Sequence, residues 1–356
     1  MRGAMHSELG FRSEPADGAA HDVDDADEPL GRGVSVVVPA YRSSNSLPEL
    51  HARVVAVMER LGIDYEIIFV EDCGGDETFT VIADLAGADA HVRGFQLARN
   101  FGQHNALLCG IRAARMDVIV TLDDDLQNPP EEIPKLLDAL AQGCDVIYGT
   151  PEREQHGFLR DMASRVTKMA LQSVMGAATA RKVSAFRAFR TVARRGFERY
   201  RSPFVSIDVL LTWGAGRFGS VPVRHAARVG GESGYTLRKL ITHALNMMTG
   251  FSTLPLQIAS MVGFTFTVLG MAVLAYVVAR YLIEGGSVPG FPFLASIIAL
   301  FSGAQLFALG IIGEYLARMH FRTMERPPYV VSERVGATTA SPLSRDSGVL
   351  AANTRP

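Results

Sequence analysis

The sequence predicts an α/β fold built on a mostly parallel sheet, followed by two membrane-spanning helices. Short apolar runs alternate with helical stretches through residues 34–148, an order typical of parallel sheets with right-handed crossovers. One of these runs, residues 118–122, leads directly into three consecutive aspartates. Two uncharged apolar stretches, residues 252–279 and 288–313, each exceed the roughly 20 residues needed to cross a bilayer.

Composition narrows the class of protein. The chain has 356 residues and a net charge of -2, which leaves no basic footprint for nucleic acid. Cys73, Cys109 and Cys144 have neither paired nor metal-type spacing, so a reducing compartment fits. The N-terminus is polar and acidic, so we expect no secretory signal. Residues 1–30 are poor in large apolar groups and predict a disordered acidic tail.

The first half of the chain reads as a series of strands and helices. Strands are predicted at residues 34–38, 65–70, 92–97, 118–122 and 145–148, and helices at residues 46–60, 78–85, 103–115 and 131–142. Ser46 and Glu49 form a capping-box pair at the start of the first helix. A dinucleotide-binding Rossmann domain is the obvious competitor. It is disfavoured because Pro39-Ala-Tyr41, and no G-x-G-x-x-G, follows the first strand.

The three aspartates are the strongest candidate site. Side chains at i and i+2 of an extended segment share a face, so Asp123 and Asp125 point together while Asp124 turns away. Two convergent carboxylates suit a hard divalent cation that also holds substrate phosphates, and ligands bind at this end of the strands in open α/β sheets. A solvated acidic turn is the alternative, which the preceding strand and the following Pro129-Pro130-Glu131 disfavour.

The middle of the chain is rich in arginine. Residues 150–201 are predicted to be helical, and their arginines form either a solvated basic face or the wall of an anion site. Residues 219–228 look like a late strand. Apolar residues at helical spacing in 237–248 predict an amphipathic helix, either interfacial or packed on the α/β domain.

The two apolar stretches predict a hairpin joined by a short Gly/Pro loop. Core helices of a soluble domain are the alternative, disfavoured by length. Arg238 and Lys239 precede the first span, and Arg318, Arg322 and Arg326 follow the second. The positive-inside rule therefore places both termini and the N-terminal domain in the cytoplasm.

A set of motifs in fixed order gives this sequence a family resemblance. The motifs are Val36-Val-Val-Pro-Ala-Tyr, Glu71-Asp, Arg99-Asn-Phe-Gly-Gln, Asp123-Asp-Asp-Leu-Gln-Asn-Pro-Pro-Glu, Ser184-Ala-Phe-Arg, Gly231-Glu-Ser-Gly-Tyr and Gly313-Glu-Tyr with Arg318. The set resembles family 2 glycosyltransferases of the polyprenyl-phosphate type, over about residues 31–331. These include the dolichol-phosphate mannose synthase-like enzymes and bacterial glucosyl transferases with a C-terminal membrane hairpin. Single motifs are weak, whereas the ordered set together with the hairpin is specific.

The resemblance implies a GT-A fold, a nucleotide-sugar donor and a polyprenyl-phosphate acceptor. It divides the chain into an acidic tail (1–30), a GT-A catalytic domain (31–235), an interfacial helix (236–253), a transmembrane hairpin (254–318) and a cytoplasmic C-terminal tail (319–356). We therefore expect an integral protein of the inner or plasma membrane, with its catalytic domain in the cytoplasm. A homo-oligomer is compatible with this organisation.

The resemblance also assigns roles to individual residues. Asp72, or Glu71 beside it, would hold the nucleotide base. Asp123 and Asp125 would bind a magnesium or manganese ion at the diphosphate, Gln127 would lie near the sugar, and Arg187 would face phosphate. The other donor-site residues are Pro39, Ala40, Tyr41, Arg99, Gln103 and Asp124. Further residues for the acceptor phosphate are Arg153, Arg165, Lys182 and Ser184.

Two departures from the family pattern stand out. Family members usually carry an aspartate two residues before Ser184, where this chain has Lys182, and a lysine is common at the position of Gly234. Other functions remain open. A processive polysaccharide synthase would carry Gln-x-x-Arg-Trp after the aspartates, but the only tryptophan, Trp213, has no such context. A regulatory pseudoenzyme or membrane scaffold is motivated by Lys182 and opposed by the intact aspartates.

Overall fold

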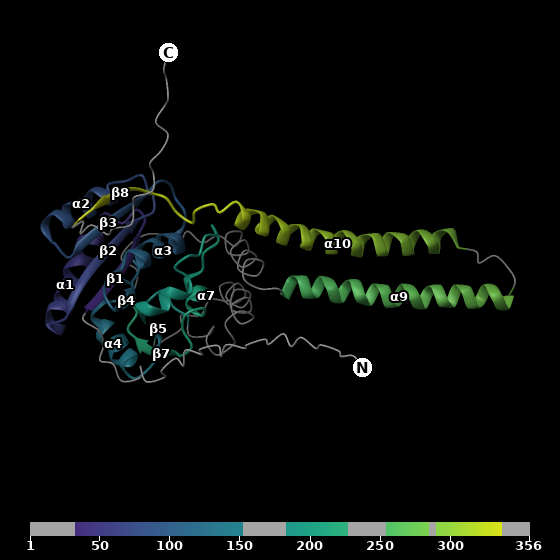
Figure 1. Ribbon diagram of the computed structural model, residues 1–356, viewed down its shortest axis with the longest axis horizontal. Coiled ribbons are helices and arrows are strands. Elements are labelled where there is room, and N and C mark those ends of the chain that lie inside the picture. Colours follow the sequence, from purple (N-terminus) through teal and green to yellow (C-terminus); the bar gives the residue numbers. More distant parts are fainter. Residues whose placement is uncertain (1–32, 152–182, 227–253, 285–289, 337–356) are drawn as a thin grey trace, which may run out of the picture.

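The computed structural model describes residues 33–151, 183–226, 254–284 and 290–336. Its N-terminal part is an α/β domain from which a long helical hairpin projects (Figure 1). The strands are β1 (Gly33–Ala40), β2 (Asp64–Glu71), β3 (Val92–Leu97), β4 (Val118–Thr121), β5 (Val146–Pro151), β6 (Arg187–Arg190), β7 (Phe218–Val223) and β8 (Val331–Val335). The helices are α1 (Leu47–Leu61), α2 (Thr78–Ala88), α3 (Gln103–Ala113), α4 (Ile133–Ala141), α7 (Ile207–Leu211), α9 (Leu254–Glu284) and α10 (Phe291–Thr323). Two 3₁₀-helices, η2 (Pro130–Glu132) and η3 (Thr191–Gly196), complete the set.

One sheet of eight strands, in the order β7-β5-β6-β4-β1-β2-β3-β8, forms the centre of the domain. Strands β4, β1, β2 and β3 pair in parallel, as do β5 and β7. Strands β6 and β8 run antiparallel to their neighbours. The mostly parallel α/β sheet expected from the sequence is therefore confirmed, because the first four strands are separated by crossover helices.

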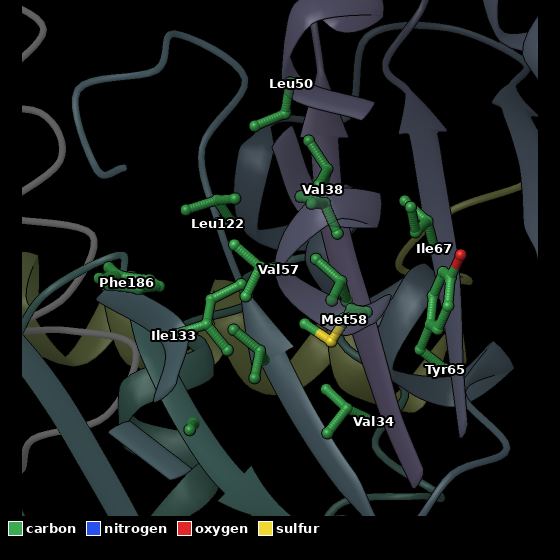
Figure 2. Close-up of a cluster of buried hydrophobic side chains, with 14 of the residues drawn as sticks. Val34, Val38, Leu50, Val57, Met58, Tyr65, Ile67, Leu122, Ile133 and Phe186 are labelled. Carbon is green, nitrogen blue, oxygen red and sulfur yellow. The ribbon is translucent and has the colours of Figure 1, made fainter. Parts of the chain in front are cut away.

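Apolar side chains cover both faces of the sheet, as expected for parallel strands. Val36 and Val38 of β1 point to the face covered by α1, α2 and α4, where Figure 2 shows part of the core. Val37, between them, points to the face covered by α3 and α7. There the helix and sheet approach so closely that a Cβ on Gly110 of α3 would lie 2.4 Å from Val37. Glycine is therefore required at position 110.

The first helix shows how local sequence and packing combine. Leu47, Leu50 and Val54 lie on its buried face at the spacing of an amphipathic helix. The capping box expected there is wrong: Ser46 makes no side-chain cap bond, and Glu49 instead pairs with Arg53 at 3.3 Å. At the other end Gly62, with φ of 63°, donates its N–H to two carbonyls of the last turn, a conformation that glycine adopts without strain.

Two sequence expectations about elements are corrected. The arginine-rich stretch 150–201 was expected to be helical, but residues 187–190 form strand β6 between β4 and β5. The segment 319–356 was expected to be a tail, but α10 extends to Thr323 and residues 331–335 form the edge strand β8 beside β3. Both strands are short and depend on partners far away in sequence. The acidic tail and the interfacial helix at 236–253 lie outside the described residues.

The two apolar helices α9 and α10 lie antiparallel as a hairpin (Figure 1). Their candidate spans are Pro255–Ile283 and Leu300–His320, with mean hydropathy of 2.1 and 1.4. None of the residues in the most apolar window of either helix is buried within the protein. Core helices of a soluble domain would be covered, so this exposure favours a membrane hairpin.

Candidate active site

The candidate site lies where three adjacent parallel strands end. Strands β1, β2 and β4 end at Ala40, Glu71 and Thr121, and their registers bring these ends together at one edge of the sheet. Each strand is followed by a non-glycine residue with positive φ: Arg42 at 58°, Cys73 at 53° and Leu126 at 60°. This conformation costs about 1–2 kcal/mol per residue and clusters at functional sites. The strain therefore points to the same edge as the aspartates.

Asp124 joins two of the loops at this edge. Its carboxylate accepts hydrogen bonds from the Tyr41 backbone N–H at 3.1 Å and from the Ser43 hydroxyl. Burial raises the pKa of Asp124, the two hydrogen bonds oppose this, and the nearby Asp125 charge raises it further; the net pKa is raised. The Asp124 carboxylate therefore holds the loop after β1 in place. This structural role is an alternative to the donor-site role expected for Asp124.

Asp123 and Asp125 belong to the same loop. The prediction that their side chains share one face of an extended strand is wrong. Strand β4 ends at Thr121, so the aspartates follow it in a turn and the alternation of an extended strand does not apply. Asp123 accepts a hydrogen bond from Gln103 Nε2 at 2.7 Å, and Asp125 accepts one from the Gln127 backbone N–H at 3.1 Å. Gln127 is also held through its carbonyl, which accepts the Ala226 N–H at 2.8 Å.

The donor set of this loop fits a shared divalent cation. Among the described residues no group of three or more His, Cys, Asp or Glu side chains is arranged to hold a metal ion. Asp123 and Asp125 would supply two carboxylate ligands from one loop. Magnesium is commonly bound by one or two protein carboxylates, with substrate phosphates and water as the remaining ligands.

The acidic pair at the end of β2, Glu71 and Asp72, accepts hydrogen bonds from the backbone of two loops. Both oxygens of Asp72 accept backbone N–H groups, from Phe101 and Gly102, each at 2.7 Å. Burial raises the pKa of Asp72, these hydrogen bonds lower it and the Glu71 charge raises it, with a raised net pKa. Asp72 therefore shapes the loop after β3. Glu71 Oε1 accepts the Gly74 N–H, whereas its buried Oε2 has no hydrogen-bond partner among the described residues.

Of the other expected donor-site residues, Pro39, Ala40, Tyr41 and Gln103 border this edge. Pro39 and Ala40 are the buried end of β1, and Tyr41 is 47% exposed beside them. Gln103, at the start of α3, reaches Asp123 across the edge. Arg99 is exposed, with its guanidinium 4.5 Å from the centre of the Phe101 ring. The structure thus brings Tyr41 and Gln103 to the loop of the three aspartates.

Arg187 does not face phosphate, which corrects the sequence expectation. Its side chain is 2% exposed and forms an ion pair with Asp208 of α7. Its Nε also donates to Thr121 Oγ1 at 3.1 Å. Tyr148 donates its hydroxyl to the same Asp208 at 3.2 Å. Arg187 is therefore a buried residue that hydrogen-bonds to Thr121, the last residue of the strand that leads to the aspartates.

The expected acceptor-phosphate residues are only partly placed. Arg153, Arg165 and Lys182 lie outside the described residues. Ser184 lies one residue before Ala185, whose carbonyl accepts the Thr121 hydroxyl at 2.7 Å. The structure therefore brings Ser184 close to the end of β4, beside the candidate site.

Three contributors were missed by sequence reasoning. Ser43 and Asp208 carry no local motif, and their partners are 81 and 21 residues away in sequence. Glu131, in the Pro-Pro-Glu segment, binds Arg53 of α1 through two contacts of 2.9 and 2.7 Å. The only sequence signal for Glu131 was its place in the Pro-Pro-Glu motif. That motif does not indicate that Arg53 is its partner.

Comparisons with known proteins give a consistent family. A family model described as glycosyl transferase family 2 matches residues 35–199. Undecaprenyl-phosphate 4-deoxy-4-formamido-L-arabinose transferase of Enterobacter sp. (strain 638) is 35% identical over 311 residues, 86% of this chain and 95% of that protein. The protein of the same description in Pseudomonas fluorescens (strain SBW25) is 34% identical over 87% of this chain and 92% of its own length.

A crystal structure of glucosyl-3-phosphoglycerate synthase from Mycobacterium tuberculosis, with Mn²⁺, UDP and phosphoglyceric acid, matches with a TM-score of 0.47 and 17% identity. The match covers 62% of this chain and 77% of that chain.

Proposed function

The chain belongs to glycosyl transferase family 2, and from that membership we propose that it transfers a sugar from a nucleotide-sugar donor to a polyprenyl phosphate at the cytoplasmic face of a membrane. The observation that carries the proposal is architectural. The helix α10 leads into β8, which pairs with β3 of the same sheet whose edge bears the aspartate loop. A catalytic sheet and a candidate membrane hairpin are thus physically joined. Relatives similar over 95% and 92% of their lengths have undecaprenyl phosphate in their names.

The donor site would be the edge formed by the ends of β1, β2 and β4. Tyr41, Glu71 and the loop after β3 lie around the nucleotide in this proposal, with Gln127 nearer the sugar. Asp123 and Asp125 would hold a magnesium or manganese ion, which when bound neutralises charge on the departing diphosphate. Gln103 orients Asp123 through its 2.7 Å hydrogen bond. Asp124 and Asp72 keep the surrounding loops in place.

The acceptor needs little activation. A phosphate monoester carries about -1.5 to -2 charges at pH 7, so the attacking oxygen is ionised before it reaches the sugar. A strong general base, as required for a sugar hydroxyl, is therefore unnecessary. Lys182, at the position of the family's usual aspartate, is compatible with transfer for this reason, and its ammonium would add to an anion site near Ser184. The arginines 153 and 165 complete the acceptor side in this proposal.

The lipid substrate explains why the enzyme is anchored. A polyprenyl phosphate keeps its phosphate at the membrane surface, so an enzyme held at that height replaces a three-dimensional search by proximity. Arg318, near the end of α10, lies with its guanidinium 4.6 Å from the centre of the Phe204 ring in the α/β domain. The hairpin therefore contacts the domain directly in addition to continuing into it.

A screen of donors tests the proposal. Purified full-length protein is incubated with undecaprenyl phosphate, magnesium and a panel of nucleotide sugars that includes nucleotide-linked 4-deoxy-4-formamido-L-arabinose. We expect one donor to yield a lipid-linked product that disappears with a chelator. If no donor is transferred or hydrolysed, a scaffold or pseudoenzyme replaces the proposal. A product that lengthens with time would instead favour a processive synthase.

A further inference from the structure

A cavity of about 580 Å³ lies away from the aspartate loop and has no role in the proposed reaction. We name it the Trp213 pocket after its most exposed aromatic residue; its lining includes Arg195, Phe197, Glu198, Arg199, Tyr200 and Trp213. Trp213 is 50% exposed and is the only tryptophan of the chain. Val192, also in this segment, is 53% exposed. The pocket thus combines a half-exposed indole with two arginines, Arg195 and Arg199.

The pocket belongs to a different edge of the sheet from the active site. Thr191, at the start of η3, donates its backbone N–H to Asp117 at 2.8 Å and its hydroxyl to Met116 at 2.6 Å. These two residues immediately precede β4, whereas the aspartates follow it. The donor and the acceptor phosphate are therefore not candidates for this cavity.

A chain of contacts connects the pocket to the end of the hairpin. The Trp213 ring lies edge-on to Tyr200, with centroids 5.6 Å apart, and the Tyr200 hydroxyl donates to the Phe204 carbonyl. The Phe204 ring contacts Arg318 at 4.6 Å, inside the candidate span Leu300–His320. Arg201 pairs with Glu325, just beyond α10, at 3.3 Å. The pocket thus continues the surface at which α10 leaves the proposed membrane.

The charge of this segment is strongly positive. Residues 190–201 contain five arginines and one acidic residue, Glu198, in a chain whose net charge is -2. Arg194 is used internally, because its guanidinium donates to carbonyls at the end of α3. Arg195 and Arg199 are exposed and, within the described part of the chain, form no ion pair. Two arginine side chains at this pocket are therefore available to an external anion.

We propose that the Trp213 pocket binds the headgroup of an anionic phospholipid of the surrounding bilayer, with the Trp213 ring seated at the membrane interface. Tryptophan and tyrosine favour the headgroup level, and basic side chains near an anionic surface are attracted to it. Arg195 and Arg199 match a phosphodiester through charge-assisted hydrogen bonds. This surface orients the α/β domain on the membrane, and it rests on the membrane placement within the proposed function.

The single tryptophan makes the proposal directly measurable. Full-length protein is reconstituted into phosphatidylcholine vesicles with or without phosphatidylglycerol, the lipids carrying bromine on an acyl carbon close to the headgroup. We expect bromolipid to quench Trp213 fluorescence in vesicles that contain phosphatidylglycerol, and added salt to weaken the quenching because it screens exposed charges. Trp213→Phe establishes the background signal.

Matched variants separate this site from general electrostatics. The double variant Arg195→Gln with Arg199→Gln should lose the dependence of quenching on phosphatidylglycerol. Arg60→Gln should keep it, since Arg60 is an exposed arginine of α1, at the end of the domain away from the hairpin (Figure 1). Equal quenching with and without phosphatidylglycerol, or none at all, overturns the proposal. Flotation of the vesicles tests the membrane placement separately: protein that floats without quenching disproves the pocket alone.

Discussion

Arg187 at the start of β6 forms a buried ion pair with Asp208 of α7, and the same guanidinium donates to Thr121, the last residue of β4. Two residues further along the chain the aspartate loop begins. The pair is joined by Tyr148, whose pKa is raised well above its ordinary value by burial and by the Asp208 charge. A buried ionic network thus lies under the strand end that presents the candidate metal ligands.

Removing one member of this pair should destabilise the protein. Asp208→Ala leaves the Arg187 cation buried without its partner, which typically costs about 3–5 kcal/mol. Unfolding by heat or denaturant in detergent measures the loss. The double replacement Arg187→Met with Asp208→Leu removes both charges and should recover much of that stability. If Asp208→Ala unfolds like the wild type, the pair is not a stabilising element and Arg187 regains its candidacy for phosphate.

Asp125→Ala should abolish metal-dependent transfer while leaving the fold intact. We expect a loss of at least about a hundredfold in turnover, equivalent to about 2.7 kcal/mol of barrier, because the proposed cation would lose a carboxylate ligand. Asp138→Asn, at an exposed position of α4, is the matched control and should keep full activity. Near-normal turnover of Asp125→Ala at low magnesium would show that the metal assignment is wrong.

Strand β8 should be needed for donor binding. The Val330 carbonyl accepts the Ala98 N–H at 2.9 Å, at the start of the loop that Asp72 holds, and Tyr329 lies beside Arg112 of α3. A chain ending at residue 328 loses these contacts and should show a raised KM for the nucleotide sugar together with lower thermal stability. A chain ending at residue 336 retains β8 and serves as the control. Equal KM values for the two truncations would rule out a link between β8 and the donor site.

Asp124 should make stability fall as pH rises in metal-free buffer. Its pKa is raised in the folded protein, mainly by burial, so the folded state holds its proton more tightly than the unfolded state. Stability from this group is then complete below the ordinary aspartate pKa and declines as pH rises through the folded value. Melting temperatures of wild type and Asp124→Asn, measured across this window, should diverge with pH. A constant difference would contradict the raised pKa.

Both ends of the chain should lie on the cytoplasmic side. Arg322 and Arg326 follow the second span, Leu300–His320, and Arg238 and Lys239 precede the first, so the positive-inside rule favours this orientation. Reporter fusions at the N- and C-termini should both give a cytoplasmic signal, whereas a reporter inserted at residues 285–289 should give an outside signal. An outside signal from either terminus would refute the hairpin topology.

Local sequence patterns predicted most of the elements and the position of the site. Strands β1 to β4 and helices α1 to α4 fall close to their predicted ranges because each carries its own apolar periodicity. A prediction failed where a side chain had another hydrogen-bonding partner within reach. Ser46 and Glu49 fit a capping box, yet Glu49 pairs with Arg53, because a side chain takes the best partner that the folded helix offers.

The sequence by itself determined the order of strands β1 to β5 and helices α1 to α4, the apolar hairpin and the aspartates at the end of a strand, because neighbouring residues carry each of these patterns. Only the tertiary structure decided which charged groups reach the site. Asp124 is held by Tyr41, 83 residues away, Arg187 is buried against Asp208, and Ser332 of β8 bonds to Gln96 across 236 residues. Such pairings depend on which strand ends and helices the fold places together, and periodicity along the chain carries no record of them.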